Sequence, residues 1–365
     1  MRLVLKMLSR LSLILRNNLN YFYVNSILKK DFSDNLILKN NQKILIGIID
    51  NISHVPTFVT LEFLIYLKSL NHKNNYIFIL PFGKKIKTMY RKNEKFVKDS
   101  DSLRVKTILH PILEIISGFN KNVFFFSNRF DAYNLIKNSK NIVLIPKNSN
   151  ILNVTRYDFS NSFFKKYLLN YNKTKKRVLL KSPVPFLDLI KKYIDFKYNQ
   201  KIVTISLKDA NYSAVRSSKI YEWLKFASFL KLRKIRVIFI LDITSLGKKN
   251  YLRKVLNNYE IYDLFSYDIR ARLAIYELSY LNCTIGSGTN VLLINSKSSY
   301  LLFSPIKEEI KYGTGSYDLW FKHVGVPIYE QFPFASKKQK IVWSKNNERF
   351  SIMVKEFLNF EKINK

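Results

Sequence analysis

In the second half of the chain, short apolar runs alternate with segments of helical length, and this alternation constrains the fold more than any other feature. The runs at 201–207, 236–242 and 299–304 are rich in β-branched and aromatic residues, as strands buried on both faces are. Helical patterns at 218–231 and 269–281 lie between them. Such alternation is typical of right-handed βαβ units around a parallel sheet, in which ligands bind where loops leave the carboxyl ends of the strands.

The first half of the chain repeats this alternation of strands and helices. Strand-like runs occur at 43–50, 75–81, 122–127 and 141–146, and helical patterns occur at 57–70, 103–117 and 130–138. A length of 365 residues is enough for two domains, and 47% hydrophobic residues exclude a disordered chain. We therefore expect an α/β protein with two Rossmann-like βαβ domains that face each other across a cleft. The predicted organisation is an N-terminal segment at 1–40, domains at 41–185 and 186–345, and a closing C-terminal helix at 346–365.

The first 17 residues form a basic amphipathic pattern. Arginines, a lysine and other polar residues fall on one side of a helical wheel, and leucines, a valine and an isoleucine fall opposite. Such a helix suits the plane of an anionic membrane surface, and it equally suits packing against the protein's own core. The apolar stretch between Arg10 and Arg16 is too short to span a bilayer, and no signal-peptide cleavage site follows.

The chain is strongly basic, with 62 lysines and arginines against 26 acids and a formal net charge of +36. This charge favours anionic partners such as phosphorylated substrates, anionic lipid or nucleic acid. An AT-rich coding bias would produce the same excess of lysine without selection for binding, so both explanations remain open. Because no basic, aromatic-lined motif of a nucleic-acid module is present, we expect no specific nucleic-acid partner.

Cysteine and histidine usage excludes several chemistries. The single cysteine, Cys283, rules out a disulfide framework and a cysteine zinc site, and it fits a reducing, cytoplasmic setting. The four histidines lack the spacing of metal ligands. We predict no metal site and no bound cofactor.

The two Rossmann-like halves and the C-terminal helix resemble the GT-B architecture of nucleotide-sugar glycosyltransferases over roughly residues 40–360. In the second half the sequence is similar to the donor-binding halves of heptosyltransferase-like and fucosyltransferase-like enzymes. The similarity lies in the strand, loop and helix at 202–230, in the segment 268–277, and in the motif 285–290. The resemblance implies a nucleotide-sugar as co-substrate and a site for its diphosphate.

A departing nucleoside diphosphate gains negative charge, which arginine, lysine or backbone amides at a helix start stabilise where no metal does so. The loop Gly286-Ser287-Gly288-Thr289-Asn290 offers amides and hydroxyls before a short helix expected near Asn290. Arg216, with Ser217 at the start of the next helix, is placed to reach the same anion. The alternatives are a plain tight turn for the glycine loop and a surface position for Arg216.

Other polar residues of the second half also bear on the donor site. Asp242 ends a strand where Rossmann folds often bind a ribose hydroxyl, or it caps the following turn. The pair Glu330-Gln331 is similar to the acid and glutamine with which some glycosyltransferases hold the donor sugar. Arg270 and Arg272, at the start of the helix at 269–281, are predicted to be surface charges.

The loop after the first strand supplies the candidate general base. Asp50 and His54 lie at the carboxyl end of the predicted sheet, where an acceptor would bind. A histidine has a pKa near neutrality, and a neighbouring carboxylate can orient it. A hydrogen-bonded loop histidine and a loop-capping aspartate are the alternatives.

The leading hypothesis is a metal-independent glycosyltransferase that moves a sugar from a nucleotide-sugar to a cell-envelope glycan or a lipid-linked acceptor. We expect it to be cytoplasmic, and peripheral on the inner face of the membrane through residues 1–17. A sugar-nucleotide epimerase or a polysaccharide pyruvyltransferase on a similar scaffold is a second hypothesis. A noncatalytic basic protein that binds membrane or nucleic acid is the third.

Overall fold

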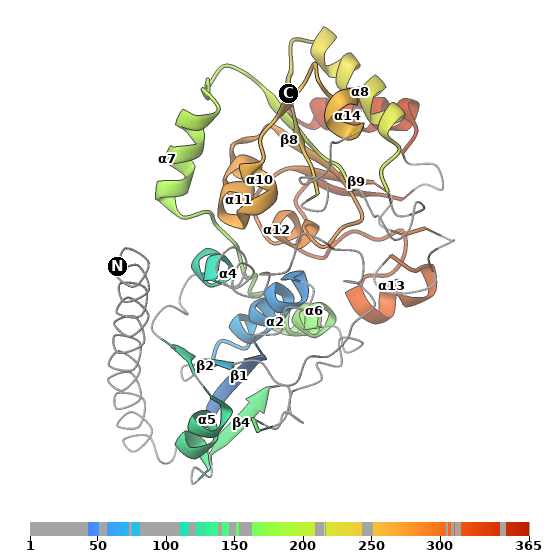
Figure 1. The fold of residues 1–365 in the computed structure, drawn as a ribbon. Coiled ribbons are helices and arrows are strands. Elements are labelled where there is room, and N and C mark those ends of the chain that lie inside the picture. The colour runs from blue at the N-terminus through green and yellow to red at the C-terminus, as the bar shows by residue number, and fades with distance from the viewer. Residues whose placement is uncertain are drawn as a thin grey trace, which may run out of the picture. The chain divides into compact units, whose positions relative to one another are not determined.

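The computed structural model describes most of the chain in separate stretches. These are residues 43–50, 57–72, 75–80, 110–116, 122–126, 128–137, 141–145, 151–152, 163–208, 215, 217–242, 251–303, 306–307, 310, 315–343 and 348–364. They group into two compact units (Figure 1). The predicted amphipathic segment 1–17 lies outside the described residues. The domain boundaries given above stay a prediction.

The first unit is built on a four-stranded parallel sheet. Its strands are β1 (Ile44–Asp50), β2 (Asn75–Leu80), β3 (Val123–Phe125) and β4 (Ile142–Ile145), in the order β3-β2-β1-β4. Helix α5 (Arg129–Ile136) begins at Asn128, whose side chain accepts a hydrogen bond from the Asp131 N–H. Ile46, Phe78 and Phe124 are among the core residues of this unit. The predicted strands of the first half are confirmed.

The second unit contains a six-stranded sheet. Its strands are β5 (Ile202–Ser206), β6 (Arg236–Ile240), β7 (Glu260–Ile261), β8 (Leu281–Ile285), β9 (Tyr300–Phe303) and β10 (Gln339–Val342). All pairs are parallel, and the order is β10-β9-β8-β5-β6-β7. From the central pair β5 and β8, the chain moves outward through β6 and β7 on one side and through β9 and β10 on the other. The strand order therefore reverses between β5 and β8.

The helices described in the second unit include three from the first half of the sequence. They are α2 (Thr57–Ser69), α4 (His110–Ile115), α6 (Phe163–Thr174), α7 (Val184–Tyr193), α8 (Ile220–Leu232), α9 (Tyr251–Val255), α10 (Leu264–Tyr267), α11 (Ile269–Leu278), α12 (Asn290–Ile294), α13 (Tyr317–Val324) and α14 (Phe350–Ile363). The predicted closing helix is α14. Helices α8 and α14 cover one face of the six-stranded sheet, and α11 and α12 cover the other (Figure 1).

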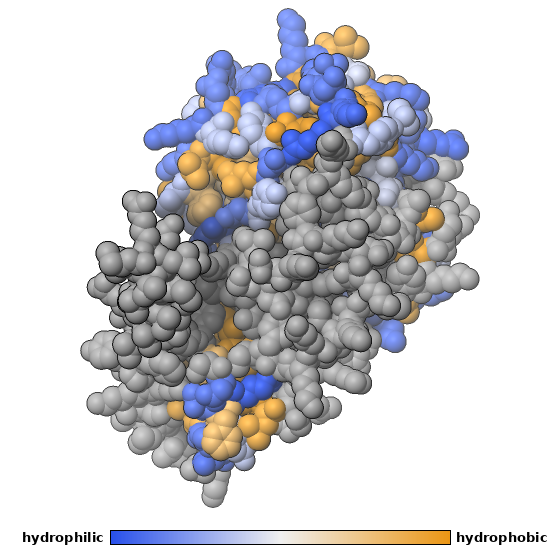
Figure 2. All heavy atoms as spheres, in the orientation of Figure 1, coloured by the Kyte–Doolittle hydropathy of each residue, from blue (hydrophilic) through white to orange (hydrophobic). Residues whose placement is uncertain are grey.

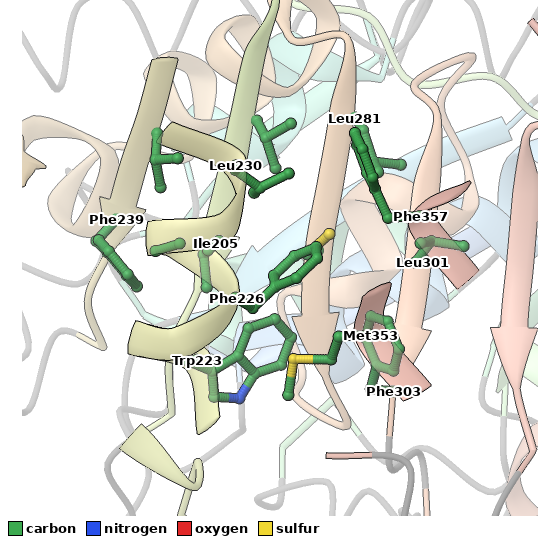
Figure 3. Close-up of a cluster of buried hydrophobic side chains, with 14 of the residues drawn as sticks. Ile205, Trp223, Phe226, Leu230, Phe239, Leu281, Leu301, Phe303, Met353 and Phe357 are labelled. Atoms are coloured by element: carbon green, nitrogen blue, oxygen red, sulfur yellow. The ribbon is translucent and has the colours of Figure 1, made fainter. Parts of the chain in front are cut away.

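The face under α8 and α14 is apolar. Alternate strand residues point to it because side chains along a strand alternate between faces. The helices complement these strands with apolar residues spaced three and four apart, such as Trp223, Phe226 and Leu230 on α8 and Met353 and Phe357 on α14 (Figure 3). Fully burying each of these side chains contributes about 1.5–3 kcal/mol. This face holds the main core of the second unit.

The opposite face of β5 and β8 is polar and nevertheless buried. Asn282 on β8 has an exposed fraction of 0%. Its Nδ2 donates to Tyr276 O at 3.0 Å and to Ser299 O at 2.9 Å, and its Oδ1 accepts from Thr204 Oγ1. Two residues further along each strand, Ser206 Oγ meets Tyr276 Oη at 2.9 Å and Thr284 Oγ1 donates to Asn290 Oδ1 at 2.9 Å. These contacts form a polar seam between the sheet and helices α11 and α12. The seam consists of Thr204, Ser206, Tyr276, Asn282, Thr284 and Asn290.

The segment between α6 and α7 is tied to the end of α12 by a half-buried arginine. Arg177 donates to Ile294 O at 2.8 Å, to Ser296 O at 2.9 Å and to Phe334 O at 3.1 Å. Carbonyls at a helix C-terminus carry partial negative charge and attract a cation. Burial lowers the pKa of the Arg177 guanidinium, but arginine remains charged at any physiological pH. Arg177, which lies outside the sheet, therefore fixes the C-terminal end of α12.

On the face that Figure 2 shows, the described surface of the second unit is largely hydrophilic. Figure 2 shows hydrophilic side chains over much of the described surface in the region of α8 and α14, with apolar patches between them. Exposed lysines such as Lys225 and Lys231 contribute to it. Within the described stretches, none of the helices is long and apolar enough to cross a bilayer.

The polar seam predicts a large loss of stability when its central residue is removed. Asn282→Ala leaves Thr204 Oγ1 and the Tyr276 and Ser299 carbonyls short of a buried partner, and each such loss costs about 1–3 kcal/mol. We expect a lower free energy of unfolding by about 3 kcal/mol in urea denaturation. The exposed Asn257→Ala is the matched control and should change it by less than about 0.5 kcal/mol. Equal effects of the two substitutions would contradict this role of the seam.

A second prediction concerns Glu62 on α2. Burial raises the pKa of its carboxyl group from 4.5 to about 8. At a pH between these two pKa values, the Glu62 carboxyl group is protonated in the folded protein and ionised in the unfolded chain. The free energy of unfolding therefore falls as the pH rises. Glu62→Gln removes the titration. The gain in unfolding free energy of the variant over the wild type should therefore grow from pH 5 to pH 8, to the order of a few kcal/mol. Denaturation curves across this range measure it, and Asp318→Asn, at an exposed carboxyl, should leave the pH slope unchanged.

Candidate functional site

The reversal of strand order between β5 and β8 marks the candidate site. In open parallel sheets, ligands bind outside the carboxyl ends of the two strands that flank such a reversal. Lys208 follows β5 and Gly286 follows β8, and Lys208 Nζ donates to Gly286 O at 2.9 Å. A positive charge and the glycine loop thus meet at the carboxyl edge of the central strands.

The glycine loop is a tight turn held by Asn290. This side chain has an exposed fraction of 5%; its Oδ1 accepts from Ser287 Oγ at 3.2 Å, and its Nδ2 donates to Ile285 O at 2.8 Å. The Asn290 N–H donates to Ser287 O at 3.2 Å, which closes the turn into α12. The N–H groups of Ser287, Gly288 and Thr289 have no acceptor among the described residues. The Asn290 side chain shapes the turn, and the amides before it are not used by the described part of the protein.

The loop between β5 and α8 is closed at its base. Lys208 N–H donates to Ser218 Oγ at 2.9 Å, and Ser218 N–H donates back to Lys208 O at 2.9 Å. Lys307, beyond β9, donates to Val215 O at 2.8 Å and pairs with Glu348 at 3.1 Å. The predicted anion ligand Arg216 lies between these fixed points, but outside the described residues.

A buried acid anchors the start of α8 beside this loop. Glu348, with an exposed fraction of 1%, accepts from the Lys219 N–H at 2.9 Å and from Trp223 Nε1 at 3.2 Å. Together with the Lys307 ammonium, these donors surround its carboxylate, as a buried charge requires. The predicted ligand Ser217 stands just before this helix start, and its carbonyl accepts from Lys307 Nζ at 3.4 Å.

The remaining predicted donor ligands fall at two places. Asp242 follows β6, the neighbour of β5, and so lies on the same carboxyl edge. Glu330 and Gln331 are exposed residues beside β10, at the border of the sheet. Gln331 Nε2 donates to Ile341 O at 2.9 Å, and its Oε1 accepts from the Ile341 N–H at 2.6 Å. The Gln331 side chain therefore covers the outer edge of β10, and no described contact joins this pair to the glycine turn.

The candidate base residues belong to the first half. Asp50 ends β1, and in that sheet the strand order reverses between β1 and β4, so its backbone occupies the position that a ligand site requires. The Asp50 side chain and the whole of His54 lie outside the described residues. Their role as base stays a prediction.

Two functional candidates were missed by sequence reasoning. Lys208 is the first charged residue after β5, and the rule that ligands bind at carboxyl ends could have identified it. The prediction that Arg272 is a surface charge is wrong, because its exposed fraction is 6%. Arg272 lies on α11 four residues before Tyr276, whose hydroxyl contacts Ser206 on β5, and a helical pattern alone does not reveal this burial. Arg270, by contrast, pairs at the surface with Asp268 and Glu114.

The described stretches hold neither a cluster of metal-ligand side chains nor an accessible thiol. Within them, no three histidine, cysteine, aspartate or glutamate side chains are grouped so that they could hold a metal ion. Burial raises the pKa of the Cys283 thiol, and this residue belongs to the apolar core. Cys283 is therefore a packing residue.

Comparison with known proteins identifies the fold. No protein-family model and no curated protein sequence matches the chain. Among solved structures, the E. coli ADP-heptose lps heptosyltransferase II is similar over 88% of this chain and 99% of its own, with a TM-score of 0.54 and 9% identity. The glycosyl transferase family 9 protein of Veillonella parvula is similar over 90% of both chains, with a TM-score of 0.51 and 6% identity.

The two similarities extend along nearly the whole chain and agree with the two parallel sheets. The protein has the GT-B fold of these glycosyltransferases. The predicted heptosyltransferase-like GT-B architecture is confirmed at the level of the fold.

Proposed function

We propose that this protein is a glycosyltransferase that takes a sugar from a nucleotide-sugar donor. The observation that carries the proposal is the meeting of Lys208 with the glycine turn outside the carboxyl ends of β5 and β8. A cation and unpaired backbone amides at a point of strand-order reversal suit a phosphorylated ligand. The GT-B fold supports the same class of reaction.

In the proposed reaction, the bond between the sugar and the donor diphosphate breaks, and the acceptor hydroxyl takes the sugar. The leaving diphosphate gains negative charge, which Lys208 and the N–H groups of Ser287, Gly288 and Thr289 stabilise from the sheet edge. Arg216 and Ser217 approach from the β5–α8 loop. Asp242 binds the ribose, and Glu330 holds the donor sugar, whereas the neighbouring Gln331 is engaged by Ile341. His54, oriented by Asp50, removes the proton from the acceptor hydroxyl.

The acceptor is a cell-envelope glycan or a lipid-linked sugar. The similarity to a lipopolysaccharide heptosyltransferase supports this assignment, and it makes ADP-heptose the first donor to test. The basic segment 1–17 would hold the enzyme on the anionic inner face of the cytoplasmic membrane. The reaction uses neither a metal nor a cofactor besides the nucleotide-sugar itself.

Incubation with a panel of nucleotide-sugars and envelope acceptors tests the proposal. We expect one donor to release its nucleoside diphosphate and yield a glycosylated acceptor, at a rate that EDTA leaves unchanged. Conversion of a nucleotide-sugar to its epimer, or pyruvyl transfer from phosphoenolpyruvate, would replace the proposal by another reaction on the same scaffold. Binding of vesicles or nucleic acid with no turnover of any donor would exclude an enzyme of this class.

Substitution of Lys208 tests the proposed diphosphate site most directly. Lys208→Met removes the positive charge beside Gly286, and we expect kcat/KM for the donor to fall about 100-fold because the developing negative charge loses one stabilising group. Lys225→Met removes an exposed lysine on α8 that pairs with Glu222, and it should leave the rate unchanged. Circular dichroism checks the fold of both variants. Wild-type turnover by Lys208→Met would count against the role of this lysine.

A further inference from the structure

Arg272 is a buried arginine on the inner side of α11. Its exposed fraction of 6% is far below that of Arg270, two residues earlier, which reaches Glu114 at the surface. Arg272 lies one helical turn before Tyr276, so the two side chains share the face that turns toward the sheet. The Tyr276 hydroxyl meets Ser206 Oγ, at the last residue of β5, at 2.9 Å.

The direction of α11 places Arg272 beyond the ends of the strands. Helix α11 leads into β8, so its N-terminal turns lie at the carboxyl edge of the sheet. Helix α10, which precedes it, is fixed at this edge, since Ser266 Oγ donates to Leu241 O just after β6 at 2.8 Å. Helical side chains lean toward the helix N-terminus, and the arginine side chain is long. Arg272 therefore extends past Ser206, toward the edge where Lys208 meets the glycine turn.

The Arg272 guanidinium has no partner among the residues that the structure describes. Its Nε is buried without a hydrogen-bond partner, and the group makes no ion pair or side-chain hydrogen bond among the described residues. The acid nearest in sequence, Asp268, caps α11 through the Arg270 and Ala271 N–H groups and pairs with Arg270. The Tyr276 hydroxyl is engaged with Ser206.

An unpaired buried cation is costly in a folded protein, and buried charges are normally paired. The Nε–H donor without a partner lies beside the terminal N–H donors of the same planar guanidinium. Two adjacent N–H groups of this kind can bind two oxygens of one oxyanion at the same time. A buried charge without a partner in the described part of the chain points to a bound ligand as its partner.

We propose that Arg272 is a buried anion-binding residue, and that it pairs side-on with a phosphate group of the nucleoside diphosphate carried by the donor. The identity of the ligand rests on the proposed function, whereas the affinity of Arg272 for a phosphate oxyanion does not. In this proposal Arg272 contacts the phosphate from α11. Lys208 and the glycine turn contact it from the carboxyl ends of β5 and β8. The diphosphate is then held by a cation that solvent cannot screen.

The test compares the full-length wild type with Arg272→Met, Arg272→Lys and the charge-matched control Arg233→Met, at the exposed end of α8. Calorimetric titration measures the affinities for inorganic pyrophosphate and for ADP, and calorimetric melting measures stability without ligand. We expect Arg272→Met to weaken both ligands by about 10- to 100-fold, the loss of a charge-assisted bond. We also expect it to melt above the wild type, because an unpaired buried charge has been removed. Arg233→Met should bind like the wild type.

Arg272→Lys keeps the charge and loses the two adjacent N–H groups, so it tests the proposal even if the methionine variant fails to fold; we expect at least a tenfold loss of pyrophosphate affinity. Wild-type affinity for pyrophosphate in the folded variants would overturn the proposal. If those variants also bind ADP and transfer sugar like the wild type, the proposed function stands and Arg272 has no part in it. If pyrophosphate depends on Arg272 while no nucleotide-sugar is turned over, the anion site stands and the proposed function fails.

Discussion

The buried hydrogen bonds of Asn282 are the interaction on which the second unit depends. A side-chain amide inside a sheet must find partners for both of its ends, because an unmet buried donor or acceptor costs free energy of folding. Asn282 finds them in Thr204 on β5, in Tyr276 on α11 and in the Ser299 carbonyl before β9. An apolar face would allow α11 to slide over the sheet, whereas directional bonds fix its position and orientation. The same seam continues through Thr284 to Asn290 and so reaches the glycine turn.

The two faces of the six-stranded sheet therefore contribute differently to the protein. The apolar face, packed against Trp223, Phe226 and Phe357, contributes most of the burial that stabilises the unit (Figure 3). The polar face positions the groups at the carboxyl edge. A site that holds an anion must carry positive charge before the ligand arrives, and this charge opposes stability while the site is empty. Arg272 is the clearest instance, and the network around Asn282 gives the rigidity that such a residue needs.

Much of the fold could be predicted from the sequence because its signals are local. The strands β1, β2, β5 and β6 stand where runs of β-branched residues predicted them, and α12 begins at Asn290 as expected. The role of Asn290 could not be predicted, since it depends on Thr284 and Ser287 facing it across the turn. The burial of Arg272 was predicted wrongly, because the two arginines of α11 look alike in sequence and differ only in which side of the helix meets the sheet.

The sequence by itself determined the alternation of strands and helices, the parallel sheets that follow from it and the place of a glycine loop after a central strand. Those features arise from steric preferences and apolar periodicity within short segments. Only the tertiary structure decided that Lys208 reaches Gly286, that Gln331 covers the edge of β10 and that Arg272 is buried with no partner among the described residues. These facts join residues far apart in the chain or depend on the packing of one helix, and no local pattern encodes which distant group a side chain will meet.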